Sequence, residues 1–249
     1  VGFSATLAST ITSTSWYHPV ARLGEKESVS VVMSNPTDVV ADVEVTVVSG
    51  EGKVGSAITS VGPYDVIQMR VLPKAEEALI ANTLFTPVKS FGIIVESSSG
   101  IPIVSGIELG SGPNGSPGKE SPKQEILAVP SDSESMKLPA GRESGFSVAS
   151  GAPGGSRNWL LVLPDVAGEV VVAVENTTSS GVTALISRYG KRERYELQLA
   201  AFAIQHLRLS GGSTIEVKSG SEVAVTAVHQ EPKGAGLSSI LGIRFAEGG

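Results

Sequence analysis

Valine-rich stretches in which hydrophobic and polar residues alternate recur along this chain. The clearest lies at 39–48, VVADVEVTVV, where every second residue from Val39 to Val47 is apolar. A period of two is typical of a strand with one buried face. Further strands, bounded by turns rich in glycine, asparagine, serine and proline, are predicted at 28–34, 65–72, 90–97 and 101–109. The last two are expected to form a hairpin.

The second half of the chain repeats this order of stretches. GEVVVAVEN at 168–176 matches ESVSVVMSN at 27–35, and AIQHLRL at 203–209 matches DVIQMRV at 65–71. The spacing between matched stretches drifts along the chain, as expected where loops vary in length and strands do not. A unit of about 100–110 residues therefore occurs twice.

Each copy opens with Gly-Phe-Ser and reaches a tryptophan fourteen residues later, at Trp16 and at Trp159. These are the 2 tryptophans of the chain, so their recurrence in one frame indicates a fixed place in each unit. A large ring at the start of an early strand covers the end of a small β core. Core packing is predicted for both rings, and an exposed platform for stacking on a sugar is the alternative.

These patterns predict an all-β fold made of two tandem β-sandwich domains, immunoglobulin-like or related, that arose by internal duplication. The predicted domains are 1–110 and 126–249, the second with a lead-in strand at 143–150. The segment 111–125, rich in glycine, serine and proline, is predicted to be a linker or a long loop. One helix is predicted at 74–84, from good helix formers after a proline.

Composition narrows the possible functions. The chain has 249 residues, a formal net charge of -6 and no cysteine, which excludes disulfides, thiolate metal sites and cysteine nucleophiles. An acidic chain is a poor electrostatic partner for nucleic acid. No apolar stretch reaches the roughly 18–20 residues that span a bilayer. We therefore predict no nucleic-acid partner and no transmembrane segment in this chain.

No arrangement of residues points to a catalytic, cofactor-binding or metal site. GSGPNG at 110–115 matches a dinucleotide fingerprint, but the prolines that follow are incompatible with the helix that would bind a pyrophosphate. The histidines His18, His206 and His229 lack metal-ligand spacing, and the Gly-x-Ser-x-Gly turn of serine hydrolases is absent. The prediction is a protein without catalysis, cofactor or metal.

Other positions recur in the two copies. The turn Asn35-Pro36 corresponds to Asn176-Thr177, and Arg70 corresponds to Arg208 on matching strands. A charged residue on an apolar strand either points outward or pairs with a buried acid, and its recurrence favours a structural role. The structural repeat positions are Trp16, Asn35, Pro36, Arg70, Trp159, Asn176 and Arg208.

The first copy carries a pattern of residues that resembles a known family: Trp16, Pro19, Asn35, Pro36, Gly50, Gly52, Ile101, Pro102, Ile103 and Val104. It resembles the repeated β-sandwich unit of actinobacterial exported proteins whose function is unknown. The second copy keeps Trp159, Pro164 and Asn176 and departs at Thr177 and at 221–223. The resemblance implies an extracytoplasmic, membrane-anchored or wall-associated setting and no known enzyme activity.

The sequence thus predicts a non-catalytic protein of the cell envelope, outside the cytoplasm, with any signal or anchor outside this chain. Its role would be structural or adhesive, or that of a scaffold that docks a protein partner, since exposed strand edges can accept an added strand. Binding of an envelope polysaccharide is one alternative. Assembly into a surface filament or virion by strand exchange is another. The partner and the oligomeric state stay open.

Overall fold

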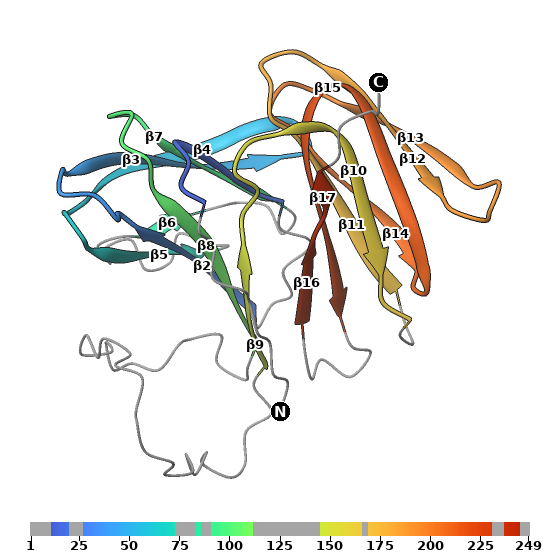
Figure 1. The fold of residues 1–249 in the computed structure, drawn as a ribbon, viewed down its shortest axis with the longest axis horizontal. Helices are drawn as coiled ribbons and strands as arrows, with labels where there is room; N and C mark the ends of the chain where they lie inside the picture. Colours follow the sequence, from blue (N-terminus) through green and yellow to red (C-terminus); the bar gives the residue numbers. More distant parts are fainter. Residues whose placement is uncertain are drawn as a thin grey trace, which may run out of the picture.

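The computed structural model describes residues 11–19, 27–72, 83–85, 91–111, 145–165, 169–230 and 237–244 (Figure 1). Within these ranges the chain forms strands and no helix, which confirms the all-β prediction. Three predicted features lie wholly or mostly outside the described residues: the N-terminal lead-in up to residue 10, the linker from residue 112 onward, and residues 74–82 of the predicted helix.

The first half of the chain forms two sheets, with strand orders β1-β7-β3-β4 and β6-β5-β2-β8-β9. The pairing of β5 with β6 is parallel, and the other strand pairs of the two sheets are antiparallel. The strands are β1 (Ser15–His18), β2 (Glu27–Ser34), β3 (Ala41–Ser49), β4 (Gly52–Val61), β5 (Val66–Leu72), β6 (Thr83–Phe85), β7 (Gly92–Ser97), β8 (Val104–Ser111) and β9 (Gly145–Ser150).

A hydrophobic core lies between these two sheets. Val43 and Val45 of β3 belong to one buried cluster with Val29 and Val31 of β2 and with Trp16 of β1. The alternation in the sequence explains this placement, because every second side chain of a strand points to the same face. Burial of each such side chain stabilises the fold by roughly 1.5–3 kcal/mol.

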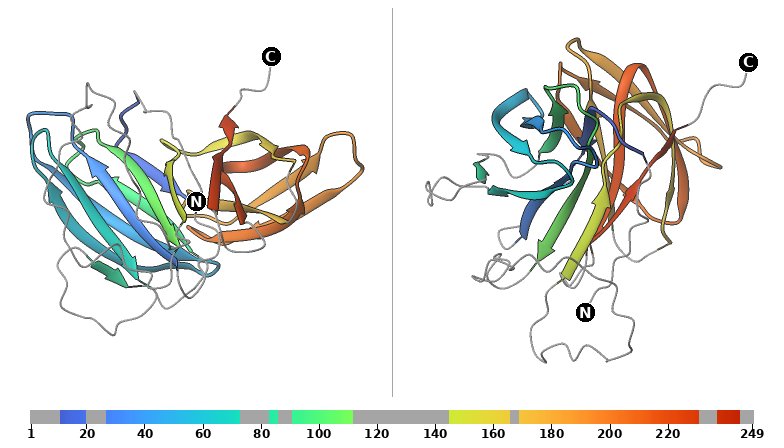
Figure 2. Two further views of the ribbon diagram at one scale, coloured as in Figure 1. Left: turned by 90° about the horizontal axis from the view of Figure 1, so that it is seen from below. Right: turned by 60° about the vertical axis from the view of Figure 1, so that its left-hand side comes forward.

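The second half forms one continuous sheet that curls on itself (Figure 2). Its longest strand is β15, of which residues 213–219 pair with β10 and β12, while residues 223–230 pair with β11 and β16. One strand thus serves both sides of the curled sheet. The strands are β10 (Ser156–Leu163), β11 (Glu169–Asn176), β12 (Val182–Arg188), β13 (Arg194–Leu199), β14 (Ile204–Ser210), β15 (Ser213–Gln230), β16 (Leu237–Leu241) and β17 (Ile243–Arg244).

The two halves pair their strands in the same order and in the same register. Trp16 of β1 lies opposite Val95 of β7, and Trp159 of β10 lies opposite Val217 of β15. Strands β1, β2, β3, β4 and β5 of the first half correspond to β10, β11, β12, β13 and β14 of the second half, in that order. Strand β7 corresponds to the start of β15, β8 to the end of β15, and β9 to β16.

The register agreement extends to the last strand of each half. Ile107 lies opposite Ala149 in the pair β8–β9, as Ala227 lies opposite Ile240 in the pair β15–β16. A glycine follows each of the two outer strands and donates its backbone N–H to the neighbouring strand: Gly151 to Ser105, and Gly242 to Val225.

Three local predictions are corrected by the pairing. The stretches 90–97 and 101–109 do not form a hairpin, because β7 and β8 lie in different sheets. The strand at 143–150, predicted as the lead-in of the second domain, pairs as β9 with β8 of the first half. Thr83 and Leu84, the end of the predicted helix, lie in strand β6. In each case pairing with a distant strand decided the outcome, and a local pattern does not contain that information.

Candidate functional site at the junction of the two halves

A short antiparallel bridge joins β1 of the first half to the segment that leads into the second. The Tyr17 N–H donates to the Ala152 carbonyl at 3.0 Å, and the Ala152 N–H donates to the Tyr17 carbonyl at 2.8 Å. Since only Gly151 separates Ala152 from the end of β9, the chain crosses here from the sheet that holds β8 to the sheet that holds β1. The same crossing joins β16 to β17, where Ile243 lies opposite Leu160.

Apolar side chains close the junction. Tyr17, Val48 and Ile94 are buried on the outward face of β1, β3 and β7, and they belong to the hydrophobic cluster of the second half. Their neighbours Trp16 and Ile93 point the other way, into the core of the first half. The sheet β1-β7-β3-β4 is therefore covered on both faces at this place, so the two halves share a continuous apolar contact.

The turn between β3 and β4 reaches the loop between β13 and β14. A Cβ at Gly52, whose φ is +113°, would lie 3.1 Å from the Ala201 carbonyl oxygen. Glycine is therefore required there for both its conformation and its size. The Lys53 Nζ lies 4.8 Å from the centre of the Phe202 ring, within the range of a cation–π contact.

Glu175 of β11 is fully buried at the junction. A Cβ at Gly92 of β7 would lie 2.9 Å from Glu175 Oε2, so this carboxyl group lies directly against the backbone of the first half. Neither carboxyl oxygen has a hydrogen-bond partner among the described residues. Burial raises the pKa of Glu175 well above its ordinary value, which favours the neutral carboxylic acid.

Tyr17 is also buried at the junction, near Glu175. Burial first, and then the nearby carboxyl groups of Glu96, Glu175 and Glu222, raise the pKa of the Tyr17 hydroxyl to about 12. The phenol is therefore neutral across the physiological range. Two of the three carboxyl groups come from the second half, so electrostatic groups of both halves meet around this ring.

His18, next along β1, is buried on the opposite side of the strand. Its Nε2 is 2.9 Å from Ser105 Oγ, and its Nδ1 has no hydrogen-bond partner among the described residues. Burial lowers the pKa of His18 to about 3, which favours the neutral imidazole. A Cβ at Gly151 would overlap the His18 ring, so the backbone can pass here only as glycine. In the second half, the position of His18 is held by Leu161 and the position of Ser105 by Val225, both apolar.

The buried apolar contact at the junction is suited to holding the two halves of the chain together. His18, Ser105 and Glu175 are closed to solvent, so a substrate has no access to them in this conformation. In the described ranges, no three His, Asp or Glu side chains form a group that could hold a metal ion. The described part of the chain also contains no helix long and apolar enough to cross a membrane.

Both tryptophans are core residues, each 1% exposed. The Trp16 indole N–H donates to the Ile103 carbonyl at 2.9 Å, and the Trp159 indole N–H donates to the Val223 carbonyl at 2.8 Å. Ile103, directly before β8, and Val223, at the start of the β15 segment that pairs with β11, are matching positions in the two halves. Each ring therefore packs in the core while its polar edge ties two strands together.

Asn35 and Asn176 hold matching turns. The Asn35 side-chain amide donates to the carbonyls of Val39 and Val61, and the Asn176 amide donates to those of Ser180 and Ala200. Each side-chain oxygen accepts the N–H and the hydroxyl of the threonine two residues later. Pro36 is exposed, whereas its counterpart Thr177 is buried and donates its hydroxyl to the Glu222 carbonyl at 3.0 Å.

The two recurring arginines lie on the outward faces of matching strands. Arg70 is half-buried on β5, and its charge acts on Glu108 of β8. Arg208 is exposed on β14. His206 lies on β14, and His229 lies near the end of β15.

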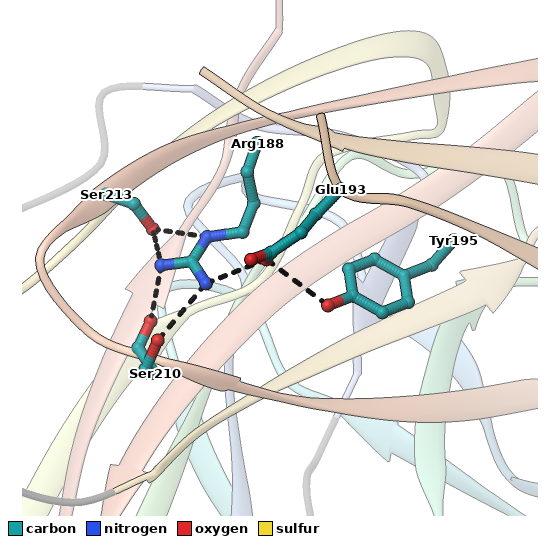
Figure 3. A network of polar contacts seen from close by, with 5 residues as sticks. All are labelled: Arg188, Glu193, Tyr195, Ser210 and Ser213. Carbon is teal, nitrogen blue, oxygen red and sulfur yellow. Dashed lines mark hydrogen bonds and ion pairs between the residues drawn. The ribbon is translucent and has the colours of Figure 1, made fainter. Parts of the chain in front are cut away.

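Arg188 was not singled out by the sequence, yet it carries the densest polar network of the second half (Figure 3). The buried guanidinium donates to Ser213 Oγ, to Ser210 Oγ and to the Ser210 carbonyl. It also pairs with Glu193 at 3.0 Å, and Glu193 accepts a hydrogen bond from the Tyr195 hydroxyl. Arg188 occupies the register position that Val47 holds in the first half, so the alternation placed it in the core without revealing its partners.

Comparison with protein families, with curated proteins and with solved structures found no match to this chain.

Proposed function

We propose that this chain is a non-catalytic structural protein of the cell envelope, outside the cytoplasm, and that its halves are two β-sandwich units derived from one by duplication. It serves as a rigid scaffold that presents a surface or docks a partner. The resemblance to repeated units of exported actinobacterial proteins supports the setting. The low content of charged residues, 18%, and the absence of cysteine are compatible with sandwiches stacked in tandem.

The matched register of the two halves supports the duplication. Corresponding strands pair in one order, the tryptophan edges bond to corresponding carbonyls, and Asn35 and Asn176 hold corresponding turns. A further parallel is backbone conformation: Tyr64 and Phe202, whose N–H groups donate to these turns, have φ values of 53° and 51°, a region that side chains other than glycine rarely adopt. Two unrelated sandwiches would have no reason to share so many details.

The observation that carries the scaffold proposal is the shared burial of Tyr17, Val48 and Ile94 under the second half. Two units on a flexible linker would leave these side chains exposed to water. Because their burial stabilises the contact, the two units act as one body, as a spacer or a docking platform requires.

Polysaccharide binding is the alternative. With Trp16 and Trp159 buried, the exposed aromatic rings among the described residues are Tyr64 and Tyr189, which are 74% and 59% exposed and lie in different halves. Two distant single rings make a weaker sugar platform than a row of rings on one face. Titration of the protein with isolated envelope polysaccharide tests this alternative, and loss of binding in Tyr189→Ala would support it.

Equilibrium unfolding tests the rigid scaffold. The variants Trp16→Phe and Trp159→Phe each keep one tryptophan, so each reports on one half. We expect coincident denaturation midpoints, because the halves share a core contact, and separated midpoints in an Ile94→Asp background. Widely separated midpoints without the junction substitution would contradict the proposal. Protease treatment of intact source cells, followed by detection with a specific antibody, tests the envelope location.

A further inference from the structure

At the internal junction, one surface of the first half contacts a different surface of the second half. Because the halves match in register, each half also has residues at the positions that form the contact surface of the other half. The second half contributes Phe202, Ile204 and Glu175. The first half contributes Tyr17, Val48 and Ile94. By register, the first half also carries a copy of the former surface and the second half carries a copy of the latter, and the described residues that make up these copies include exposed apolar side chains.

The copy on the first half consists of Tyr64 and Val66. Together with the exposed Val39 and Val40, which follow the Thr37 that accepts the Tyr64 N–H, it is called the donor end here. Val66 lies opposite Ser34 as Ile204 lies opposite Glu175. The Tyr64 N–H donates to the Thr37 carbonyl as the Phe202 N–H donates to the Thr178 carbonyl. All four side chains are exposed, including 54% of Val66. Where the second half buries Ile204 and partly buries Phe202, the first half presents an apolar group to solvent.

The copy on the second half is called the acceptor face here and consists of the outward residues of β10, β12 and β15. The pair Leu160 and Glu216 corresponds in register to the pair Tyr17 and Ile94 of the first half. The Tyr189 N–H donates to the Thr214 carbonyl, and these two residues correspond to Val48 and Gly92, which lie opposite each other. Tyr189 is exposed. On the same face, Val162 and Leu185 are 61% and 49% exposed.

We propose that this chain associates with further copies of itself head to tail, the donor end of one copy docking on the acceptor face of the next in the arrangement of the internal junction. The inference depends on the two-unit architecture proposed above and names the partner of that scaffold as a second copy of the chain. The contact is heterologous, since each copy uses two different surfaces. Such contacts build open filaments or closed rings.

The charges that flank the two surfaces are complementary, and Glu216 of the acceptor face is paired with Lys218 at 3.4 Å. The donor end carries Asp65 and the exposed Asp38, and the hairpin beside the acceptor face carries the exposed Lys191 and Arg192. This hairpin joins β12 to β13 in the place where the β3–β4 turn carries Lys53, whose Nζ lies over the Phe202 ring. A cation from this hairpin would lie over the Tyr64 ring in the same way, which adds a specific contact to the apolar one.

Sedimentation velocity of the full chain over a range of concentrations tests the proposal. We expect a monomer at low concentration and a growing series of larger species as concentration rises. Tyr64→Asn removes the ring of the donor end and suits the left-handed backbone at this position, so folding is preserved. Tyr189→Glu disrupts the acceptor face at an exposed position. Each variant alone is expected to remain monomeric.

The decisive measurement is the mixture of these two variants. Tyr64→Asn keeps an intact acceptor face and Tyr189→Glu keeps an intact donor end, so the mixture should give a 1:1 dimer and nothing larger. Ile58→Glu, which changes an apolar side chain 76% exposed on β4 and outside both surfaces, should behave as the unchanged chain does.

Three results would overturn the inference: a chain that stays monomeric at every concentration, a mixture that stays monomeric, or an Ile58→Glu variant that abolishes association. Continued association of both single variants would also overturn it, since it would point to another route such as exchange of an outer strand. None of these outcomes affects the coincident unfolding of the two halves, so the scaffold proposal is judged separately.

Discussion

Gly151 lies directly against the ring of His18, so closely that the backbone leaves no space for a Cβ. The glycine is the point at which the chain crosses from β9 to the bridge with β1, and the histidine occupies the end of β1. Gly242 has the same relationship to Leu161 in the second half, where a Cβ would lie 3.1 Å from Leu161 Cδ1. In both halves, therefore, the glycine at which the chain crosses from one sheet to the other packs its backbone closely against a buried side chain.

Gly151→Ala is expected to destabilise the protein by about 1–3 kcal/mol, the usual cost of overpacking a core that cannot expand. Urea denaturation of the variant and of the unchanged chain measures this difference. Gly220→Ala is the matched control, because a Cβ at Gly220 meets nothing within 4 Å. If the two alanine variants were equally stable, the contact with His18 would not constrain the crossing.

The buried His18 should make stability fall in acid. Its pKa is lowered to about 3 in the folded chain, so the unfolded chain binds a proton first as the pH drops below about 6.5. The stability contributed by the neutral ring is present above that pH and is lost as the pH falls toward 3. Between pH 7.5 and 4.5 the loss attributable to His18 is about 3 kcal/mol.

The double variant His18→Leu with Ser105→Val isolates this effect, since it copies the apolar pair Leu161 and Val225 of the second half. Denaturation midpoints at several pH values should show a shallower acid dependence for this variant than for the unchanged chain. Parallel pH curves would mean that His18 becomes protonated within the fold without cost.

Glu175 has the opposite dependence on pH. Its folded-state pKa is raised, so both states are neutral below about pH 4.3, and above that pH the unfolded state ionises first. The stability contributed by the neutral carboxyl is therefore complete in acid and declines by about 1.4 kcal/mol per pH unit until the folded-state pKa is reached.

Glu175→Gln keeps the size of the side chain and removes its titration. We expect this variant to be more stable than the unchanged chain at pH 7 and equally stable at pH 4, by denaturation at both pH values. Glu222→Gln, at an exposed position near the same junction, serves as the control and should change little. A variant that is less stable at pH 7 would show that the carboxylate form has a role that the fold depends on.

Arg188 should tolerate an apolar substitute better than a small one. Arg188→Ala leaves a cavity and removes the donors to Ser210 and Ser213, and we expect a loss of about 2–4 kcal/mol. Arg188→Met fills the space as Val47 does in the first half, and a loss of about 1 kcal/mol or less is expected. Thermal unfolding of both variants shows whether Arg188 stabilises the fold mainly by filling space or mainly by its hydrogen bonds. Equal losses would assign the stabilisation to the hydrogen-bond network.

Much of the fold could be read from local patterns. The alternation at 39–48 predicted β3, and the recurrence of Trp16 at Trp159 predicted equivalent places, because both depend on which face of a strand is buried. The junction could not be read in this way. Glu175 sits where the first half has Ser34, and nothing in its neighbours along the chain shows that Gly92 lies against it.

The sequence by itself determined the all-β character and the positions of most strands, since a period of two is a local property of the chain. The tertiary structure decided which sheet each strand joins. It placed β9 in the first half, separated β7 from β8, and buried Tyr17 and Glu175 between the halves. The reason is physical: strand pairing and burial depend on contacts between residues distant in sequence, and those contacts exist only once the chain has folded.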